Sequence, residues 1–307
     1  MTNTTLPGWL RQHLAALRAL LAFTVIVGVA YPLAVWGVAQ LPGLRDKAQG
    51  SMVQAADGKT VGSRLIGQSF TDDEGNPLKQ YFQSRPSAAG DGYDPTSTSA
   101  SNLGPEDIVD TLPVAGAKDD EGNPDEGNQT LLTQVCTRSK AAGELEGVDG
   151  ARPFCASSGV GAVLSVIGPR DAAGRVTRPA RVISVNEACP AAPFTPTYLG
   201  VTVECAKPGE SYAEGRIVPI RGSAPADPAV PSDAVTASGS GLDPAISPAY
   251  ARLQAKRVAT ARGLGDDRVL ELIERHTTGR ALGLMGEPHV NVVELNLELD
   301  RVAPFKG

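Results

Sequence analysis

The most pronounced pattern in the chain is an uncharged, largely apolar run from Ala19 to Ala39. In a helix that rises 1.5 Å per residue, about 20 apolar residues span a hydrocarbon layer of about 30 Å. A secretory signal peptide cleaved at Gly37-Val38-Ala39 is the alternative, but its apolar region usually has only about 7–15 residues. The run therefore predicts a transmembrane helix at residues 14–39 after a short tail at 1–13, with a kink at Pro32.

Charges beside this run predict its orientation. Arg11 and Arg18 precede it without a neighbouring acid, whereas Arg45 and Lys47 after it are partly offset by Asp46. Cytoplasmic flanks of membrane helices carry the excess of basic residues. We therefore expect a single-pass protein of the cell membrane, with lipid around its helix, a cytoplasmic N-terminus and the bulk of the chain outside.

Helical periodicity returns in the last third of the chain. Ser247 suits an N-cap and Pro248 the first helical position, and apolar residues then recur on one face until a C-cap at Gly263. A second helix is expected from Asp266 to near Gly279. The sequence thus predicts two consecutive helices that bury one face each.

Beyond Pro288 the spacing of the apolar residues changes to two. Apolar and polar side chains alternate here, with Val293, Leu295, Leu297 and Leu299 set against Glu294, Asn296 and Glu298. Strict alternation is typical of a strand that has one buried and one wet face. We therefore predict a strand at this end of the chain.

Further extended segments are predicted upstream. Asp57-Gly58 between Met52–Ala55 and Thr60–Ile66 indicates a hairpin, and Gln80–Gln83 is expected to be a short extended piece. Short β-branched runs follow in the middle of the chain, at Val163–Ile167, Arg181–Val185, Val201–Val203 and Arg216–Ile220. The expected fold class is α+β, with one N-terminal transmembrane helix and an extracytoplasmic mixed α/β domain.

All four cysteines, Cys136, Cys155, Cys189 and Cys205, lie in this middle region. An even number of cysteines outside a membrane indicates two disulfides, although free thiols and a zinc site are the alternatives. A zinc site usually has closely spaced cysteine pairs, which this sequence lacks. Short loops close most easily, so we predict Cys136–Cys155 and Cys189–Cys205, each worth roughly 3 kcal/mol.

Charge and motifs narrow the chemistry. The net charge of −6 and the pI near 5.2 argue against nucleic-acid binding, which needs a basic field. The sequence contains no H-E-x-x-H or G-x-S-x-G motif, so no catalytic residue or metal ligand is assigned. A glycine-rich turn before a helix can hold a phosphate. Ser238, Gly239, Ser240 and Gly241 are weak candidates for such a cofactor site, because the Walker and dinucleotide spacings are missing.

Several longer motifs occur in a fixed order along the chain. They are GSRLIGQSF at Gly62–Phe70, YFQSRPSAAG at Tyr81–Gly90, GYD at Gly92–Asp94, SNLGP at Ser101–Pro105, TASGSGLDP at Thr236–Pro244, ISP at Ile246–Pro248, RVATARGL at Arg257–Leu264, HTTGR at His276–Arg280, GEP at Gly286–Pro288 and NLELD at Asn296–Asp300. Together with the N-terminal helix, they make the chain resemble the C subunit of the Kdp-type potassium-transporting ATPases, the KdpC family.

The resemblance implies a non-catalytic accessory subunit that stabilises an ATP-driven, high-affinity potassium uptake pump. The implied partners are a catalytic P-type ATPase subunit, a channel-like potassium-translocating subunit and a small membrane subunit. ATP and potassium would be handled by the complex, so we expect no cofactor on this chain. The family has also been assigned a helper role in ATP binding, whereas the expected outside location favours a cap over the outer ion entrance. A membrane-tethered extracytoplasmic binding or adhesion module unrelated to transport is the alternative.

The resemblance also sets the expected domain organisation. Residues 40–111 and 224–307 would form the family-like core, and residues 112–223 an inserted β-rich, disulfide-stapled subdomain. Loops rich in glycine and proline present backbone groups to a partner, so Arg85–Pro105 and Thr236–Pro244 are the expected contact surface. The candidate interface residues are Arg85, Tyr93, Asp94, Asn102, Asp243 and Ser247.

Overall fold

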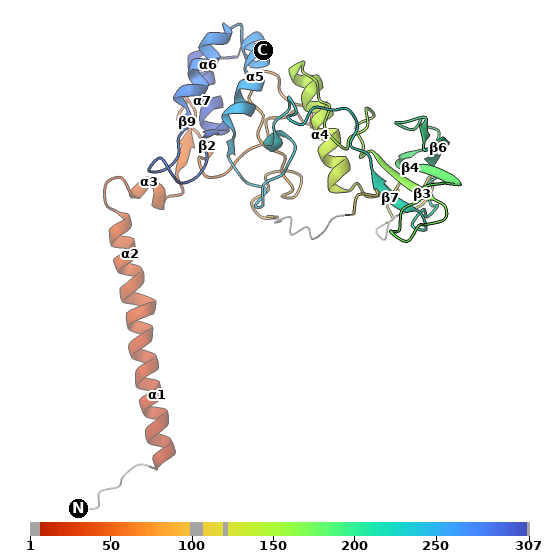
Figure 1. The fold of residues 1–307 in the computed structure, drawn as a ribbon. Helices are drawn as coiled ribbons and strands as arrows, with labels where there is room; N and C mark the ends of the chain where they lie inside the picture. The colour runs from red at the N-terminus through yellow and green to blue at the C-terminus, as the bar shows by residue number, and fades with distance from the viewer. Residues whose placement is uncertain (1–6, 99–106, 119–121, 306–307) are drawn as a thin grey trace, which may run out of the picture. The chain divides into compact units, whose positions relative to one another are not determined.

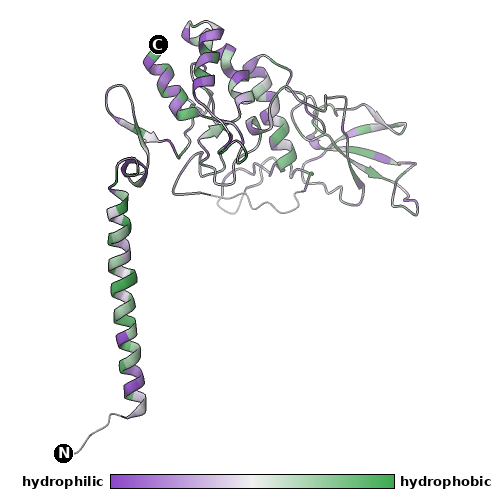
Figure 2. Ribbon diagram, turned by 60° about the vertical axis from the view of Figure 1, so that its left-hand side comes forward, coloured by the Kyte–Doolittle hydropathy of each residue, from purple (hydrophilic) through white to green (hydrophobic). Residues whose placement is uncertain are grey.

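The computed structural model of the chain describes residues 7–98, 107–118 and 122–305, and the chain divides into two compact units, residues 1–65 and 66–307. In the first unit a continuous helix runs from Gly8 to Ala39 and has no buried residue. It consists of α1 (Gly8–Val25), a π-helical turn (Ile26–Ala30) and α2 (Tyr31–Ala39). Its length and composition suit a membrane span, and Figure 2 shows hydrophobic residues along most of it.

The π turn lies where Pro32 disturbs the helix. A proline inside a helix lacks an N–H, and its ring clashes with the carbonyl group four residues earlier. Here the turn before Pro32 is widened, and the Tyr31 N–H donates to the Ile26 carbonyl five residues back. A π bulge of this kind is one of the usual ways in which a helix absorbs such a disturbance.

The predicted hairpin follows the helix. After the short helix α3 (Arg45–Ala48), strands β1 (Met52–Gln54) and β2 (Thr60–Ser63) pair antiparallel, with Met52 opposite Ser63. Gly58 in the connecting turn has φ +82°, a conformation that glycine adopts without steric cost. The Asp57 carboxylate accepts a hydrogen bond from the Lys59 N–H and stabilises this turn.

Three helices form the core of the second unit (Figure 1). They are α5 (Pro248–Arg262), α6 (Asp266–Arg275) and α7 (Val292–Val302). The first two match the prediction, because the Ser247 hydroxyl caps the Tyr250 N–H and Gly263 ends α5 with φ +64°. Fully buried residues from all three helices include Val258, Leu272 and Leu295. A 3₁₀ turn, η2 (Ser232–Ala234), precedes them.

Helix α7 corrects the predicted strand at residues 293–299. The buried residues Val292, Leu295, Asn296 and Leu299 have the i, i+3, i+4, i+7 spacing of a helix. The strand prediction was wrong because it placed Asn296 on a wet face, whereas this side chain is 2% exposed. Asn291 also caps the helix by accepting a hydrogen bond from the Glu294 N–H. The strand that precedes α7 is β10 (His289–Asn291). It is the central strand of a small antiparallel sheet, between β8 (Ala245–Ile246) and β9 (Thr277–Thr278).

A five-stranded sheet makes up the other part of the second unit. Its strand order is β5 (Thr197–Tyr198), β6 (Val201–Ala206), β4 (Arg181–Ala188), β3 (Val163–Ile167) and β7 (Arg216–Pro219). Only β4 and β6 pair in parallel, and the other neighbours are antiparallel. The predicted fold class, a mixed α/β chain with one N-terminal apolar helix, is therefore confirmed.

Both predicted cysteine pairs are found. Cys136 bonds to Cys155, which ties helix α4 (Leu131–Glu146) to the segment before the sheet, and Cys189 bonds to Cys205 between β4 and β6. None of the four cysteines is left as a free thiol.

Helix α4 joins the predicted insertion to the core. Its Val135 and Ala142 pack against the buried cluster of α5, α6 and α7. Its last residue, Glu146, forms an ion pair of 3.0 Å with Arg257 of α5, and both side chains are at most 7% exposed. Residues 112–223 thus contain a helix that packs on the core as well as the five-stranded sheet.

Candidate functional site

The two motif loops predicted as a contact surface lie side by side. We define them as residues 85–98, the described part of the first loop, and residues 236–244. The Arg85 guanidinium forms an ion pair of 3.0 Å with the Asp243 carboxylate and donates a second hydrogen bond, of 3.2 Å, to the Thr236 carbonyl. Their side chains are 23% and 31% exposed. These two candidate interface residues therefore bind each other and join loops that are 158 positions apart.

Tyr93 and Ser87 complete this junction. The Tyr93 hydroxyl donates to the Arg85 carbonyl at 2.8 Å, and the Tyr93 N–H donates to the Ser87 hydroxyl at 2.8 Å. The Ser87 hydroxyl in turn donates to the Gly241 carbonyl at 2.6 Å. Burial raises the pKa of the Tyr93 hydroxyl to about 12, so Tyr93 stays a neutral donor at physiological pH.

Two glycines allow the loops to approach. A Cβ at Gly67 would overlap the Tyr93 ring and lie 2.6 Å from the Asp243 carbonyl oxygen. A Cβ at Gly241, which has φ +70°, would lie 2.7 Å from the Cβ of Ala89. Glycine is needed at both positions because the backbones meet without room for a side chain.

The side chains of two further interface candidates, Asp94 and Ser247, bind within local turns and caps. The Asp94 carboxylate accepts hydrogen bonds from the N–H and the hydroxyl of Thr96, which is a local turn. Ser247 caps α5 and bonds to the Asp233 carboxylate through its N–H and its hydroxyl. Asn102 lies outside the described residues. The structure thus brings Arg85, Tyr93 and Asp243 together and uses Asp94 and Ser247 in local stabilisation.

The glycine-rich turn at residues 238–241 is held by local hydrogen bonds at its C-terminal end. The Gly241 N–H donates to the Ser238 carbonyl at 3.2 Å, and the Leu242 N–H donates to the Ser240 hydroxyl at 3.2 Å. The Leu242 carbonyl accepts from the Gly67 N–H at 2.8 Å. A phosphate cradle needs several free N–H groups that point at the anion. The two N–H groups at the end of this turn are already occupied, which favours the interpretation as a structural turn.

An open recess of about 410 Å³ lies beside the first motif loop. Arg85 and Tyr93 line it from the loop, and Arg138, Ala142 and Tyr250 line it from α4 and α5. Arg138 also donates to the Val235 carbonyl at 3.2 Å. The first motif loop therefore borders a concave surface that is open to solvent.

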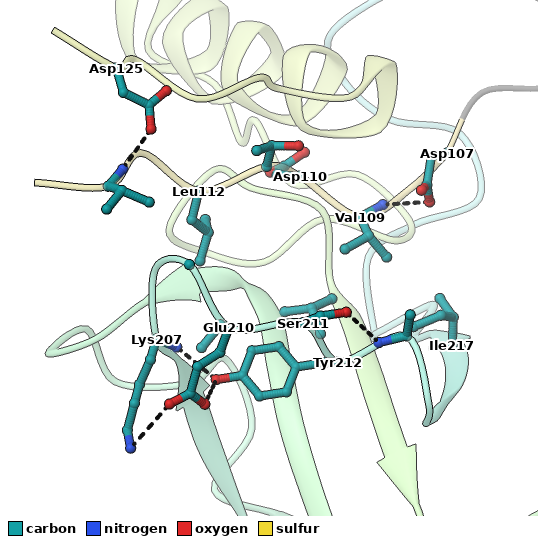
Figure 3. Close-up of a pocket in the computed structure, with 16 residues that line it drawn as sticks. Asp107, Val109, Asp110, Leu112, Asp125, Lys207, Glu210, Ser211, Tyr212 and Ile217 are labelled. Atoms are coloured by element: carbon teal, nitrogen blue, oxygen red, sulfur yellow. Dashed lines mark hydrogen bonds and ion pairs between the residues drawn. The ribbon is translucent and has the colours of Figure 1, made fainter. Parts of the chain in front are cut away.

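A second open cavity, of about 450 Å³, lies within residues 107–217 (Figure 3). Figure 3 shows Lys207, Glu210 and Tyr212 on one side, where Tyr212 donates to Glu210 at 2.9 Å and Lys207 approaches Glu210 at 3.6 Å. On the other side the Asp107 carboxylate accepts from the Val109 N–H. The polar side chains named here already have partners, so we place the candidate site in the motif loops.

Sequence reasoning missed two buried side-chain amides that hold the backbone of Phe82 and Gln83, just before the first motif loop. The Gln254 side chain exchanges two hydrogen bonds with the Gln83 backbone, at 2.6 and 3.1 Å. The Asn296 side chain does the same with the Phe82 backbone, at 2.9 Å for each bond. Residues 80–83, predicted to be a short extended piece, thus lack a strand partner and are held by side chains from α5 and α7. The signal that could have revealed these contacts is the presence of Gln254 and Asn296 on the otherwise apolar faces of α5 and α7.

Comparison with known proteins agrees with the family resemblance that the motifs indicate. The family described as K+-transporting ATPase, c chain matches residues 13–139 and 210–301. Relatives described as potassium-transporting ATPase KdpC subunits are 37% identical to this chain. The protein of Kineococcus radiotolerans aligns over 98% of this chain and all of its own length, and that of Mycobacterium tuberculosis over 95% and 99%. The Streptomyces coelicolor protein aligns over 99% of both chains.

A single apolar helix joined to a mixed α/β unit, with these matches, defines a membrane-associated subunit of an ion-transporting ATPase. The chain belongs to the KdpC family of potassium-transporting ATPase subunits. The alternative, a binding or adhesion module unrelated to transport, is not supported. The family match leaves residues 140–209 uncovered, although the relatives align across nearly the whole chain. That gap includes β3, β4, β5 and β6 and lies within the predicted insertion at residues 112–223.

Proposed function

We propose that this chain is a non-catalytic assembly subunit that holds a potassium-transporting ATPase together and caps its outer ion entrance. Family membership and the fully exposed apolar helix carry the proposal. A helix of this kind is stable only when lipid or other membrane helices surround it. Its small residues Gly28 and Gly37 leave room for close helix packing, which drives association inside a membrane.

The proposed partners are a catalytic P-type subunit, a channel-like potassium-translocating subunit and a small membrane subunit. The contact surface is formed by the motif loops and the recess beside them. Arg85 and Asp243 act by fixing the two loops relative to each other, so that exposed groups such as Gly239 and Ser240 are presented in one arrangement. The acidic net charge of the chain favours cations near the entrance.

The two disulfides support an outside location for residues 66–307, because disulfides persist in oxidising compartments. A Lys59→Cys variant tests the orientation, since the native chain has no other free thiol. A membrane-impermeant thiol reagent should label this cysteine in intact cells. A Gln12→Cys variant, which leaves Arg11 and Arg18 in place, is the matched control and should be labelled only after lysis. The reverse pattern would overturn the proposed orientation.

The proposed location of residues 66–307 outside the cell predicts that this chain does not bind ATP. The full-length chain in detergent should show no saturable binding of a fluorescent ATP analogue, because the N–H groups of Gly241 and Leu242, at the end of the glycine-rich turn, are already hydrogen-bonded. Ser240→Ala should also leave the apparent ATP affinity of the assembled transporter unchanged. Saturable micromolar binding that Ser240→Ala abolishes would instead support a helper role in ATP binding.

A further inference from the structure

The turn between β9 and β10, which we call the 280–287 turn, exposes three large apolar side chains. Leu282 is 88% exposed, Leu284 84% and Met285 59%. The first two are the most exposed large apolar side chains in the described part of the chain, above every residue of the membrane helix. Single exposed leucines are common, but a cluster of three within four positions marks an interaction site.

Internal hydrogen bonds hold this turn in one conformation. Ala281 and Met285 exchange backbone hydrogen bonds of 2.8 and 3.0 Å, and the Gly283 N–H donates to the Arg280 carbonyl at 3.1 Å. At its base the Arg280 guanidinium contacts both oxygens of the Glu287 carboxylate, at 3.0 and 2.7 Å. The backbone that carries the apolar side chains is therefore held in one conformation before any partner binds, which lowers the entropy cost of binding.

The turn is also anchored in the core. Strand β10 pairs with β9 through His289–Thr278 and Val290–Thr277. Val290 is fully buried in the cluster formed by α5, α6 and α7. The 280–287 turn is thus the exposed end of a rigid element and not a loosely attached loop.

Charge argues for a protein partner and against a lipid surface. Segments that insert into a membrane surface usually carry several lysines or arginines for anionic headgroups. The 280–287 turn has only Arg280, which Glu287 neutralises. An apolar centre beside exposed polar groups is instead the usual arrangement of a protein–protein interface, which has an apolar core and a polar rim. Membership in a subunit family supplies such partner chains.

We infer that Leu282, Leu284 and Met285 insert into an apolar pocket on another subunit of the same transporter, as a contact separate from the motif loops. This inference rests on the proposed function as an assembly subunit.

The test uses the full-length chain with Leu282→Gly and Leu284→Ser combined. Leu282 has φ +54°, so glycine fits its backbone without strain. Recovery of the partner subunits in detergent should fall about tenfold or more, which is typical when hot-spot residues are removed. The unfolding midpoint of the isolated chain should stay unchanged. Leu199→Gly is the matched control, because Leu199 is also exposed, also has positive φ (50°) and lies in the turn between β5 and β6.

A photocrosslinking amino acid at position 284 identifies what covers the turn. Crosslinking to a partner polypeptide in the assembled transporter is expected. Normal recovery of the partners with the double variant, or crosslinks to lipid alone, would overturn this inference. Either result would leave the proposed function intact. The proposed function fails only if removal of the whole chain leaves assembly and potassium uptake unaffected.

Discussion

Glu146→Ala is expected to destabilise the folded chain by about 3–5 kcal/mol, because it leaves the Arg257 guanidinium buried without its carboxylate partner. The side chains of Glu146 and Arg257 are 1% and 7% exposed, and the pair links α4 to α5. Burial raises the pKa of the Glu146 carboxyl above its ordinary value, while Arg257 opposes this shift. The desolvation cost is therefore already present in the native chain, and loss of one partner leaves it uncompensated.

Denaturant unfolding of the full-length chain in mild detergent measures this change. Arg268→Ala is the matched control, since its pair with Glu271 is about half exposed and should contribute less than about 1 kcal/mol. Equal effects of the two substitutions would contradict the proposed importance of the buried link between α4 and α5.

Asn296→Leu should cost about 2–6 kcal/mol, because it leaves both the N–H and the carbonyl of Phe82 buried without a partner, at about 1–3 kcal/mol for each group. Leucine has the same number of side-chain heavy atoms and the same branching as asparagine, so no cavity forms and the expected loss comes mainly from hydrogen bonding. Phe82 is fully buried and Asn296 is 2% exposed, which means that water cannot replace the lost bonds.

The same unfolding measurement tests this prediction. Glu298→Gln, also on α7, is the control and should change stability little, because Glu298 is partly exposed and 3.8 Å from Arg301. A loss below about 0.5 kcal/mol for Asn296→Leu would mean that the Phe82 backbone finds other partners.

Local signals explain what the sequence predicted well. The uncharged run, the Ser247 cap, the Gly263 C-cap and the Asp57-Gly58 hairpin are each defined by a few neighbouring residues. The cysteine pairs followed from short loop closure, with separations of 19 and 16 residues.

Contacts between residues far apart in the chain explain what the sequence analysis missed. Alternation at residues 293–299 fits a strand as well as a helix, and the contact that buries Asn296 comes from Phe82, 214 positions away. Likewise, the sequence did not indicate that Arg85 and Asp243, two predicted interface residues, bind each other across 158 positions. A single sequence does not reveal such pairings, because neither residue alone specifies its partner.

The most direct test of the assembly role is purification of the transporter from cells that lack this chain. The catalytic and channel-like subunits should then fail to purify together, and uptake at limiting potassium should be lost, with both restored by the full-length chain. Recovery of a stable complex of the other subunits without this chain would contradict the account.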